Sequence, residues 1–572
     1  MEYSAIFHDM DKRFCYAIDK NLFVIRVQVK KDDMKEVILH YEDKYIPMER
    51  KDTRMTLPMK KVATSQFHDY YEAQLRMNLI CLRYFFEFTD TQGEKVYYGN
   101  YEFDKECITN RDRMFDCPQN LREEEMFEVP EWAANKVVYQ IFPSRFAATQ
   151  PVDKELWYKA PITPMDDLHG NLRGIIEHLD YIKDLGIDVV YLTPIFKSNS
   201  CHKYDTIDYY QVDPSFGTTE DLKELVQKSH ERGMKVVLDA VYNHSGREFF
   251  AFQDILEKGE KSKYLDWYFI DELPPKGEWG EIPNFKCFGY YGGMPKLNLK
   301  NPEVEKYITD VACYWIKECD IDGWRLDVGD EISHFFWKNF RKAIKAVKKD
   351  MLIIGEIWHY AGDFLEGDEW DTVMNYPFYL NLIDLLADEK INVSQFVQNL
   401  GYLKGRLNKK CYPLMWNLID SHDTARFLHL CNDNKKKQHL AAAFQLLLPG
   451  MPMVYYGDEY AMPGANDPDC RRGMYWDEEY QDKEMYNWYK KLMQIRKTHA
   501  CIVEGAMIET IANDDEDTIV MIRKNGEETI AMLFNCGSSA KEFDEYAKKY
   551  NLLTDSEFSG KVEGLDAAVI VL

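Results

Sequence analysis

The chain has 572 residues, of which 45% are hydrophobic and 29% are charged, and its formal net charge at pH 7 is -26. This length predicts about three or four domains, and the composition excludes a disordered or fibrous chain. The excess of negative charge repels phosphate groups, so it argues against nucleic acid and membrane surfaces as partners and favours a neutral ligand.

Targeting and membrane signals are missing from the sequence. No stretch approaches the roughly 18 continuous apolar residues of a membrane-spanning helix. Charged side chains interrupt residues 1–30, where a signal peptide needs an apolar core. The 13 cysteines show neither a CxxC pair nor a regular spacing, which favours buried thiols in a reducing compartment over a metal cluster. We therefore expect a cytoplasmic protein.

Residues 1–125 predict an N-terminal β-sandwich domain. Residues 22–29 and 82–88 are rich in β-branched and aromatic side chains, and the turn sequence at residues 90–93 precedes a short strand. The charged run at residues 122–125 is expected to be a linker to the next domain.

Residues 126–500 predict a catalytic barrel. Short apolar strands alternate with amphipathic helical stretches, which is typical of βα units around a parallel sheet, and eight such strands make a closed (β/α)8 TIM barrel. The long aromatic-rich loop at about residues 245–298, after the third strand, predicts an inserted subdomain. The eight strands are expected at residues 137–142, 189–192, 236–241, 323–328, 352–357, 372–376, 414–419 and 453–456.

Residues 501–572 predict a C-terminal β domain. Two apolar strands, at residues 518–522 and 529–534, flank Asn525-Gly526, and Asn-Gly between such strands is a strong hairpin signal. The predicted fold is therefore of the α/β class, with a TIM barrel between N-terminal and C-terminal antiparallel β-sandwich domains.

Three carboxylates follow strongly apolar stretches: Asp327, Glu356 and Asp423. At the carboxyl ends of barrel strands they converge on the face where barrel active sites lie, and paired carboxylic acids carry out glycoside hydrolysis. For one acid alone, a salt-bridged strand end is the more ordinary interpretation. Three acids in this order favour an active site.

The surroundings of two of these acids suggest different roles. Arg325 shares a strand face with Asp327 and is predicted to lower its pKa, which keeps a nucleophile ionised. An apolar setting is predicted to keep Glu356 protonated as the general acid. A separation of about 5 to 5.5 Å between the pair would indicate a retaining mechanism. Asp423, preceded by His422, is expected to hold sugar hydroxyls.

Four motifs resemble those of the α-amylase family of glycoside hydrolases. The resemblance implies that Asp327 is the nucleophile, Glu356 the acid/base and Asp423 the transition-state stabiliser. It covers nearly the whole chain and also implies a TIM barrel. The four motifs occupy residues 239–244, 323–327, 355–358 and 421–423.

Residues 202–206, 294–298 and 466–472 are similar to the neopullulanase, cyclomaltodextrinase and maltogenic amylase subgroup. The subgroup implies hydrolysis of α-1,4-glucosidic bonds in cyclodextrins, pullulan and maltooligosaccharides, with some transfer to sugar acceptors. It also implies a starch-binding-type N-terminal domain, which covers the active site of the partner in a homodimer. An α-glucosidase or an α-1,6-specific hydrolase on the same barrel is the alternative, and a binding protein without catalysis is opposed by the three carboxylates.

The resemblance also implies a set of substrate-binding residues. Tyr204 is expected to stack its ring on the sugar at the cleavage point, although a core tyrosine is the ordinary alternative. Glu331 and Trp358 are expected on the leaving-group side. For His244, a satisfied core histidine is the ordinary alternative. The whole predicted set is Tyr204, Asp239, Asn243, His244, Arg325, Glu331, Trp358, His422 and Arg472.

A calcium site of related enzymes is doubtful in this chain. Related members often place Asn and Asp ligands just after an Arg-Phe pair, but here Arg145-Phe146 is followed by residues 147–150, Ala-Ala-Thr-Gln. Calcium takes about six to eight oxygen ligands, and alanine side chains have none. Asp153 or Asn171 could retain a weaker site. We expect that the chemistry requires no cofactor or metal.

Overall fold

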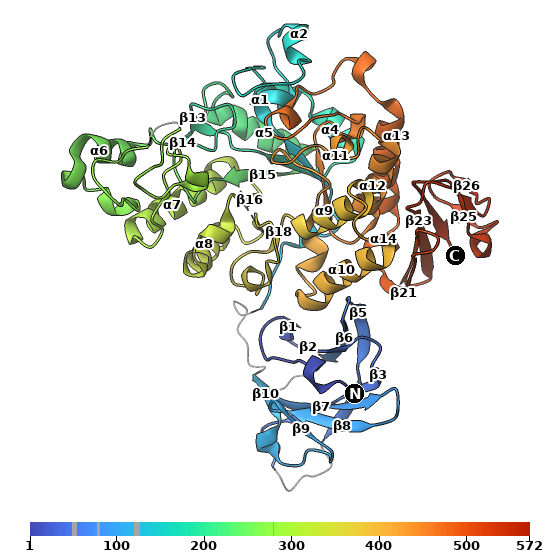
Figure 1. Cartoon of the computed structure of the whole chain (residues 1–572). Coiled ribbons are helices and arrows are strands. Elements are labelled where there is room, and N and C mark those ends of the chain that lie inside the picture. Colours follow the sequence, from blue (N-terminus) through green and yellow to red (C-terminus); the bar gives the residue numbers. More distant parts are fainter. Residues whose placement is uncertain (48–53, 77–80, 119–125, 278–279) are drawn as a thin grey trace. The chain divides into compact units, whose positions relative to one another are not determined.

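The computed structural model describes residues 1–47, 54–76, 81–118, 126–277 and 280–572 (Figure 1). The predicted linker at residues 122–125 lies outside this part. Contacts divide the chain into two units, of which the first comprises Met1–Glu128, Ala361–Asp368 and Ser394–Tyr412 and the second the rest. In the described residues, no helix has the length and apolarity needed to cross a bilayer.

The first unit contains two antiparallel sheets, and they confirm the strands predicted at residues 22–29 and 82–88 and the short strand predicted after the turn at residues 90–93. The first sheet has the order β1 (Cys15–Asp19), β2 (Leu22–Lys30), β6 (His68–Arg76) and β5 (Lys60–Thr64). The second has the order β4 (Met55–Pro58), β3 (Met34–Asp43), β7 (Cys81–Asp90), β8 (Lys95–Gly99) and β9 (Glu102–Asp104), and β10 (Phe115–Pro118) pairs with β7.

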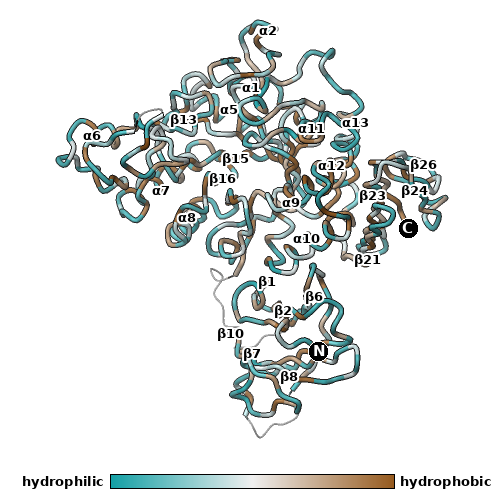
Figure 2. Tube along the Cα trace, in the orientation of Figure 1, coloured by the Kyte–Doolittle hydropathy of each residue, from teal (hydrophilic) through white to brown (hydrophobic). Residues whose placement is uncertain are grey.

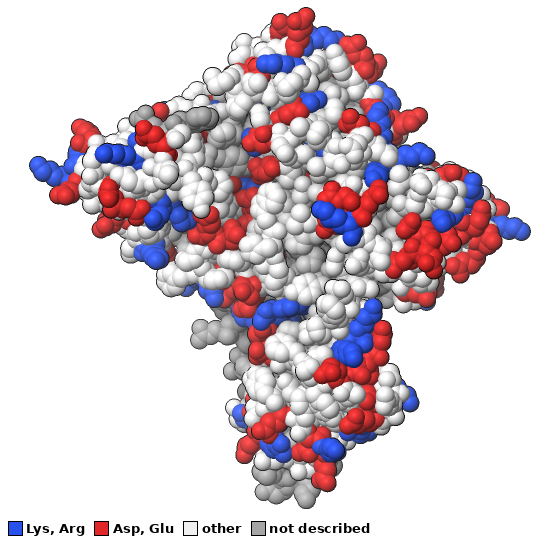
Figure 3. Space-filling view, viewed as in Figure 1, with Lys and Arg blue, Asp and Glu red and all other residues white. Residues whose placement is uncertain are grey.

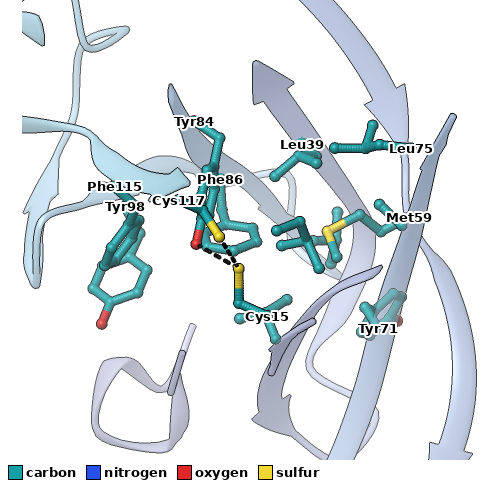
Figure 4. Close-up of a cluster of buried hydrophobic side chains, with 14 of the residues drawn as sticks. Cys15, Leu39, Met59, Tyr71, Leu75, Tyr84, Phe86, Tyr98, Phe115 and Cys117 are labelled. Atoms are coloured by element: carbon teal, nitrogen blue, oxygen red, sulfur yellow. Dashed lines mark hydrogen bonds between the residues drawn. The ribbon is translucent and has the colours of Figure 1, made fainter. Parts of the chain in front are cut away.

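Side chains from both sheets meet in one apolar core (Figure 4). Cys15 and Cys117 lie within it, with their Sγ atoms 2.8 Å apart, and the Tyr84 hydroxyl lies 3.8 Å from the Cys15 sulfur. Successive side chains of a strand point to opposite faces, so alternate residues of these strands supply the core.

A helical segment outside the sandwich sequence belongs to the first unit. Most of α10 (Val393–Arg406) and the turn that follows it group with the sheets. Arg26 on β2 accounts for the attachment, because its Nη1 donates to the carbonyls of Gly405 and Leu407, both at 2.9 Å, while its Nη2 pairs with Glu72 at 2.9 Å.

Within the described residues of the second unit, eight parallel strands form the predicted barrel. The parallel bridge between Met374 and Trp416 joins the two ends of the sheet and closes it. Five of the eight strands are shorter than predicted, and two of them have only two residues each. The order is β18 (Thr372–Val373), β17 (Leu352–Gly355), β16 (Gly323–Leu326), β15 (Lys235–Ala240), β12 (Val189–Leu192), β11 (Val138–Ile141), β20 (Met451–Tyr455) and β19 (Trp416–Asn417).

The barrel strands are apolar almost throughout, because one face packs inside the barrel and the other against helices. Figure 2 shows brown, hydrophobic trace in this central region. Thr218 opens the helix that follows β14 (Thr206–Val212) with a capping box. The longer helices of this unit are α5 (Thr219–Glu231), α7 (Pro302–Cys319), α8 (His334–Val347), α12 (Lys435–Leu447) and α13 (Lys483–Thr498).

Three aspartates recur at the amino-terminal ends of the barrel strands. Asp188, Asp322 and Asp371 each accept a backbone N–H from the neighbouring strand, at 3.1, 2.9 and 2.9 Å. Each also pairs with basic side chains; Asp322, for example, binds Lys235 at 2.9 Å and Lys348 at 3.1 Å. Fixed geometry at this end of a barrel serves stability, because the chemistry occurs at the other end.

The insertion after β15 contains α6 (Phe250–Lys258) and isolated antiparallel bridges such as Tyr268 to Leu297. The C-terminal segment forms a six-stranded antiparallel sheet and a two-stranded one. The predicted hairpin is confirmed, since β22 (Thr518–Asn525) and β23 (Glu528–Asn535) pair around Gly526, whose φ is 59°. In Figure 3, acidic side chains gather over this C-terminal domain.

Candidate active site

The carboxyl ends of neighbouring barrel strands bring the predicted acids together. Leu326 on β16 pairs with Gly355 on β17, so the next residues, Asp327 and Glu356, leave adjacent strands side by side. Asp239 on β15 pairs with Arg325 on β16. Strand register therefore places these groups at one end of the barrel, as the sequence predicted.

The guanidinium of Arg325 lies at the centre of this cluster and is fully buried. Its Nη1 is 3.1 Å from both carboxylate oxygens of Asp239 and 3.0 Å from Asp327 Oδ1. Its Nη2 is 2.9 Å from Glu356 Oε2 and 3.8 Å from Asp423 Oδ2. Four carboxylates thus share this guanidinium.

Because four carboxylates share the Arg325 guanidinium, the charge state of Asp327, the candidate nucleophile, differs from the one expected. Burial raises the pKa of Asp327 well above its usual value, and together with the charges of Glu356 and Asp239 it outweighs the opposing effect of Arg325. Burial likewise raises the pKa of Asp239 to about 6. Arg325 does lower the pKa of Asp327, as predicted, but burial and the neighbouring carboxylates outweigh it, so the expected net lowering is wrong for the resting enzyme. Protons in such a cluster belong to the interacting groups together.

The predicted apolar setting of Glu356 is also wrong. Its Oε2 accepts a hydrogen bond from the Val328 N–H at 2.9 Å and forms an ion pair with Arg325 Nη2 at 2.9 Å, and its Oε1 accepts a hydrogen bond from Trp358 Nε1 at 3.2 Å. Adjacent strands lie about 4.8 Å apart, so the paired positions of Asp327 and Glu356 favour the shorter carboxylate separation, about 5 to 5.5 Å, of retaining enzymes.

A second group of polar side chains adjoins Asp239. The Tyr204 hydroxyl donates to Asp239 Oδ2 at 3.0 Å and contacts His422 Nε2, and the Tyr191 hydroxyl donates to the same carboxylate oxygen at 2.6 Å. The rings of Tyr204 and His422 are nearly parallel, with 6° between their planes. His422 Nε2 also lies 3.2 Å from Asp423 Oδ2. The structure therefore brings these predicted residues together.

A third group of polar side chains consists of Asn243, His244, Glu331 and Lys296. Asn243 Nδ2 donates to Glu331 Oε2 at 3.0 Å, and Lys296 Nζ donates to Asn243 Oδ1 and lies 3.3 Å from Glu331 Oε2. His244 Nε2 is 3.1 Å from the Tyr204 carbonyl. Burial lowers the pKa of His244 to about 3 and also lowers that of Lys296. Lys296 was not predicted as a site residue, although it lies in the motif at residues 294–298.

Arg471, rather than Arg472, reaches the carboxylates. Arg471 Nη2 lies 3.4 Å from Asp423 Oδ1, and its Nε donates to the His422 carbonyl at 2.8 Å. Arg472 Nε donates instead to Asp469 Oδ1 at 2.8 Å. The structure does not confirm the prediction for Arg472, because the 3-10 turn that ends at Arg471 points successive side chains about 120° apart.

Trp358 has its own position beside the cluster. Its ring stacks on Tyr376 with centroids 4.0 Å apart, and 43% of the tryptophan remains exposed. An exposed indole face next to an acid can meet the apolar face of a sugar ring.

The two residues that could retain a weaker calcium site, Asp153 and Asn171, each cap a helix. Asp153 accepts the Glu155 N–H at 2.9 Å as a helix cap, and Asn171 Oδ1 accepts the Gly174 N–H at 2.8 Å in the same role. Over the residues that the structure describes, no three His, Cys, Asp or Glu side chains gather in a way that could hold a metal ion. One oxygen of each of these two side chains thus already accepts a backbone N–H group.

Comparison with known proteins gives the family of the chain. The model "Alpha amylase, catalytic domain" matches residues 140–505, and "Alpha amylase, N-terminal ig-like domain" matches residues 1–119. The chain therefore belongs to the α-amylase family, and it is a glycoside hydrolase.

Similar proteins narrow the group further. The chain is 41% identical to a cyclomaltodextrinase of Geobacillus thermopakistaniensis, over 99% of this chain and 97% of that protein. It is 40% identical to a maltogenic alpha-amylase of Bacillus acidopullulyticus, over 94% and 92%. A solved structure of a cyclomaltodextrinase superposes with a TM-score of 0.94 at 36% identity and covers 100% of both chains.

Proposed function

We propose that this enzyme is a retaining hydrolase of α-1,4-glucosidic bonds in cyclodextrins, pullulan and maltooligosaccharides, with some transfer to sugar acceptors. The observation that carries the proposal is the pair Asp327 and Glu356, on adjacent strands and bound to neighbouring nitrogens of Arg325. The names of the similar cyclomaltodextrinase and maltogenic alpha-amylase support the substrate class.

In the first step Asp327 attacks the anomeric carbon. Its Oδ1 is held by Arg325, while its Oδ2 has no hydrogen-bond partner among the described residues, so that oxygen is available to form the bond to carbon. The bond from the anomeric carbon to the glycosidic oxygen breaks, and Glu356 protonates the departing oxygen. Before the attack, the proton that the raised pKa of Asp327 favours on that carboxyl group moves within the cluster to Glu356, which leaves Asp327 ionised as the nucleophile and Glu356 protonated as the acid.

In the second step Glu356, now ionised, removes a proton from water, whose oxygen attacks the anomeric carbon and releases Asp327. A sugar hydroxyl in place of water gives the transfer product. Asp423 lies 3.8 Å from Arg325 and stabilises the positive charge that develops on the sugar.

The leaving-group side is assigned to Trp358 and Glu331. The half-exposed indole stacks on Tyr376, so it is a rigid platform for a sugar ring. Glu331 is held by Asn243 and Lys296, and its carboxylate can accept a sugar hydroxyl. The Trp358 ring and the Glu331 carboxylate together favour binding of the leaving sugar, or of a sugar that accepts the transferred glycosyl group.

We also propose a homodimer, which rests on the likeness to the subgroup, and location in the cytoplasm. A relative from Bacillus subtilis, 38% identical to this chain, is named an intracellular maltogenic amylase. Sedimentation of the purified protein tests the dimer, because a monomeric mass at micromolar concentration contradicts it.

Product analysis tests the activity. The enzyme is incubated separately with β-cyclodextrin, pullulan and maltotriose, with and without a chelator, and the products are separated by chromatography. Cleavage of α-1,4 bonds in pullulan leaves panose, whereas cleavage of α-1,6 bonds leaves maltotriose. Release of maltotriose from pullulan establishes the alternative α-1,6-specific enzyme. If none of the three glucans yields a product, the proposal is refuted.

A further inference from the structure

Gln140 on β11 makes a buried hydrogen bond to His422, 282 residues later in the chain. Gln140 Nε2 lies 2.9 Å from His422 Nδ1, and both side chains are fully buried. We propose that Gln140 is a positioning residue that holds His422 as the tautomer with its proton on Nε2. The inference rests on the proposed function, since His422 borders the sugar only if the carboxylate cluster is the active site.

The groups that face His422 Nε2 require a proton there. The Tyr204 hydroxyl donates its own proton to Asp239 Oδ2 at 3.0 Å, so its oxygen accepts a hydrogen bond from His422 Nε2. Asp423 Oδ2 lies 3.2 Å from the same nitrogen. In the other tautomer, the lone pair of Nε2 would face a carboxylate, which is unfavourable in a buried site.

The imidazole has one proton rather than two. Burial, followed by the positive charges of Arg471 and Arg325 and by the neighbouring His202, holds the pKa of His422 well below its usual range. A neutral imidazole with its proton on Nε2 leaves Nδ1 as an acceptor. Gln140 offers the amide N–H that this buried acceptor needs, because a buried polar atom without a partner is costly.

The hydrogen bonds then run in one direction along four residues. The Gln140 amide donates to His422, His422 donates to Tyr204, and Tyr204 donates to Asp239. His422 Nε2–H is therefore set as a donor before substrate arrives, and no tautomer exchange is needed when a sugar hydroxyl or Asp423 accepts it. Pre-set donors of this kind lower the reorganisation cost of catalysis.

The tautomer can be read directly in the resting enzyme. In a sample labelled with 15N-histidine, the His422 signal is identified by its loss in His422→Gln. We expect a protonated Nε2 and an unprotonated Nδ1 in the wild type. A proton on Nδ1 overturns the proposal, whether or not any substrate is hydrolysed.

Substitution of Gln140 tests the cause. In Gln140→Glu the carboxylate accepts a proton from Nδ1, so we expect His422 to carry a proton on Nδ1. The pH profile of kcat should change shape, and kcat should fall by on the order of 10²-fold with KM little changed. Gln140→Leu, which introduces no charge, should lower kcat without adding a protonated Nδ1 signal. An unchanged tautomer and pH profile in Gln140→Glu refute the proposal.

Gln445 offers a matched control, because it is also a fully buried glutamine whose amide donates to main-chain carbonyls, those of Asn417 at 3.1 Å and Met453 at 2.7 Å. Gln445→Glu should cost stability but leave the His422 signal and the pH profile of kcat unchanged. An equal change in both variants means that a buried charge alone is responsible and refutes the role of Gln140. If the wild type hydrolyses no α-glucan, the proposed function fails, while the spectrum still decides the tautomer.

Discussion

The active-site carboxylates should make the folded enzyme less stable as the pH rises, and Asp239→Asn isolates one part of this effect. The pKa of Asp239 is raised, by burial above all, from 3.8 to about 6. Between these values the folded protein binds a proton more tightly than the unfolded chain does. The stability that this group contributes is therefore present at low pH and is lost as pH rises through the window from about 4 to 6.

The size of the effect follows from the pKa difference. Each unit of pKa difference corresponds to about 1.36 kcal/mol, so a value of about 6 in place of 3.8 corresponds to about 3 kcal/mol. The amide that replaces the carboxylate in Asp239→Asn does not titrate. The stability of this variant relative to the wild type should therefore improve by up to about 3 kcal/mol between pH 4 and pH 7.

Urea denaturation at several pH values measures this difference, with tryptophan fluorescence as the signal, because Trp324 and Trp416 are buried in the barrel. Asp322→Asn is the control. Burial alone would raise the pKa of Asp322, but His230 and Lys348 outweigh burial and lower this pKa to about 2. Its contribution is fully present above about pH 4, so this variant should lose a constant amount of stability across the same range. A relative stability of Asp239→Asn that does not vary with pH refutes the reasoning.

Three further predictions concern activity. Asp327→Asn cannot form the glycosyl ester, so kcat on β-cyclodextrin should fall by on the order of 10⁵-fold. Calorimetry should still detect binding of β-cyclodextrin to this variant. Loss of binding as well would mean that Asp327 has a structural role. Arg471→Gln removes one of the charged partners of Asp423, so kcat/KM should fall by on the order of 10-fold or more. Arg472→Gln should have a smaller effect, because Arg472 binds Asp469 instead, and the reverse order contradicts the geometry. Trp358→Ala should lower the ratio of transfer to hydrolysis products at high maltose concentration, and an unchanged ratio counts against the platform.

Sequence patterns predicted the barrel well because its strands are buried on both faces. Apolar runs such as residues 189–192 and 352–357 are too short for buried helices, and their place between helical stretches favours parallel strands. The sequence could not predict that residues 394–412 group with the first unit, because this grouping depends on Arg26, which binds carbonyls at and near Gly405. A contact between residues so distant in the chain leaves no periodic signal.

For the candidate site, the position of the residues was predicted better than their environment: Asp327 and Glu356 lie together at one end of the barrel, as expected. Asp327 and Glu356 were found because strand ends can be read from hydrophobic runs. The charge state was misjudged because Arg325 faces four carboxylates rather than one, and three of them, Asp239, Glu356 and Asp423, come from other parts of the barrel. The choice between neighbouring arginines likewise depended on the rotation of a short turn, which the residue types do not determine.

Crowding of carboxylates around Arg325 is unfavourable in the resting enzyme and favourable in the transition state. Burial and mutual repulsion raise the pKa values of Asp239 and Asp327, which means that the folded site resists full ionisation. In the proposed mechanism, a sugar that develops positive charge at its anomeric carbon relieves this repulsion, so the cluster would bind the transition state better than the neutral substrate. Repulsion among the carboxylates lowers the stability of the fold but supports catalysis. Asp239→Asn should therefore gain stability at neutral pH and lose activity.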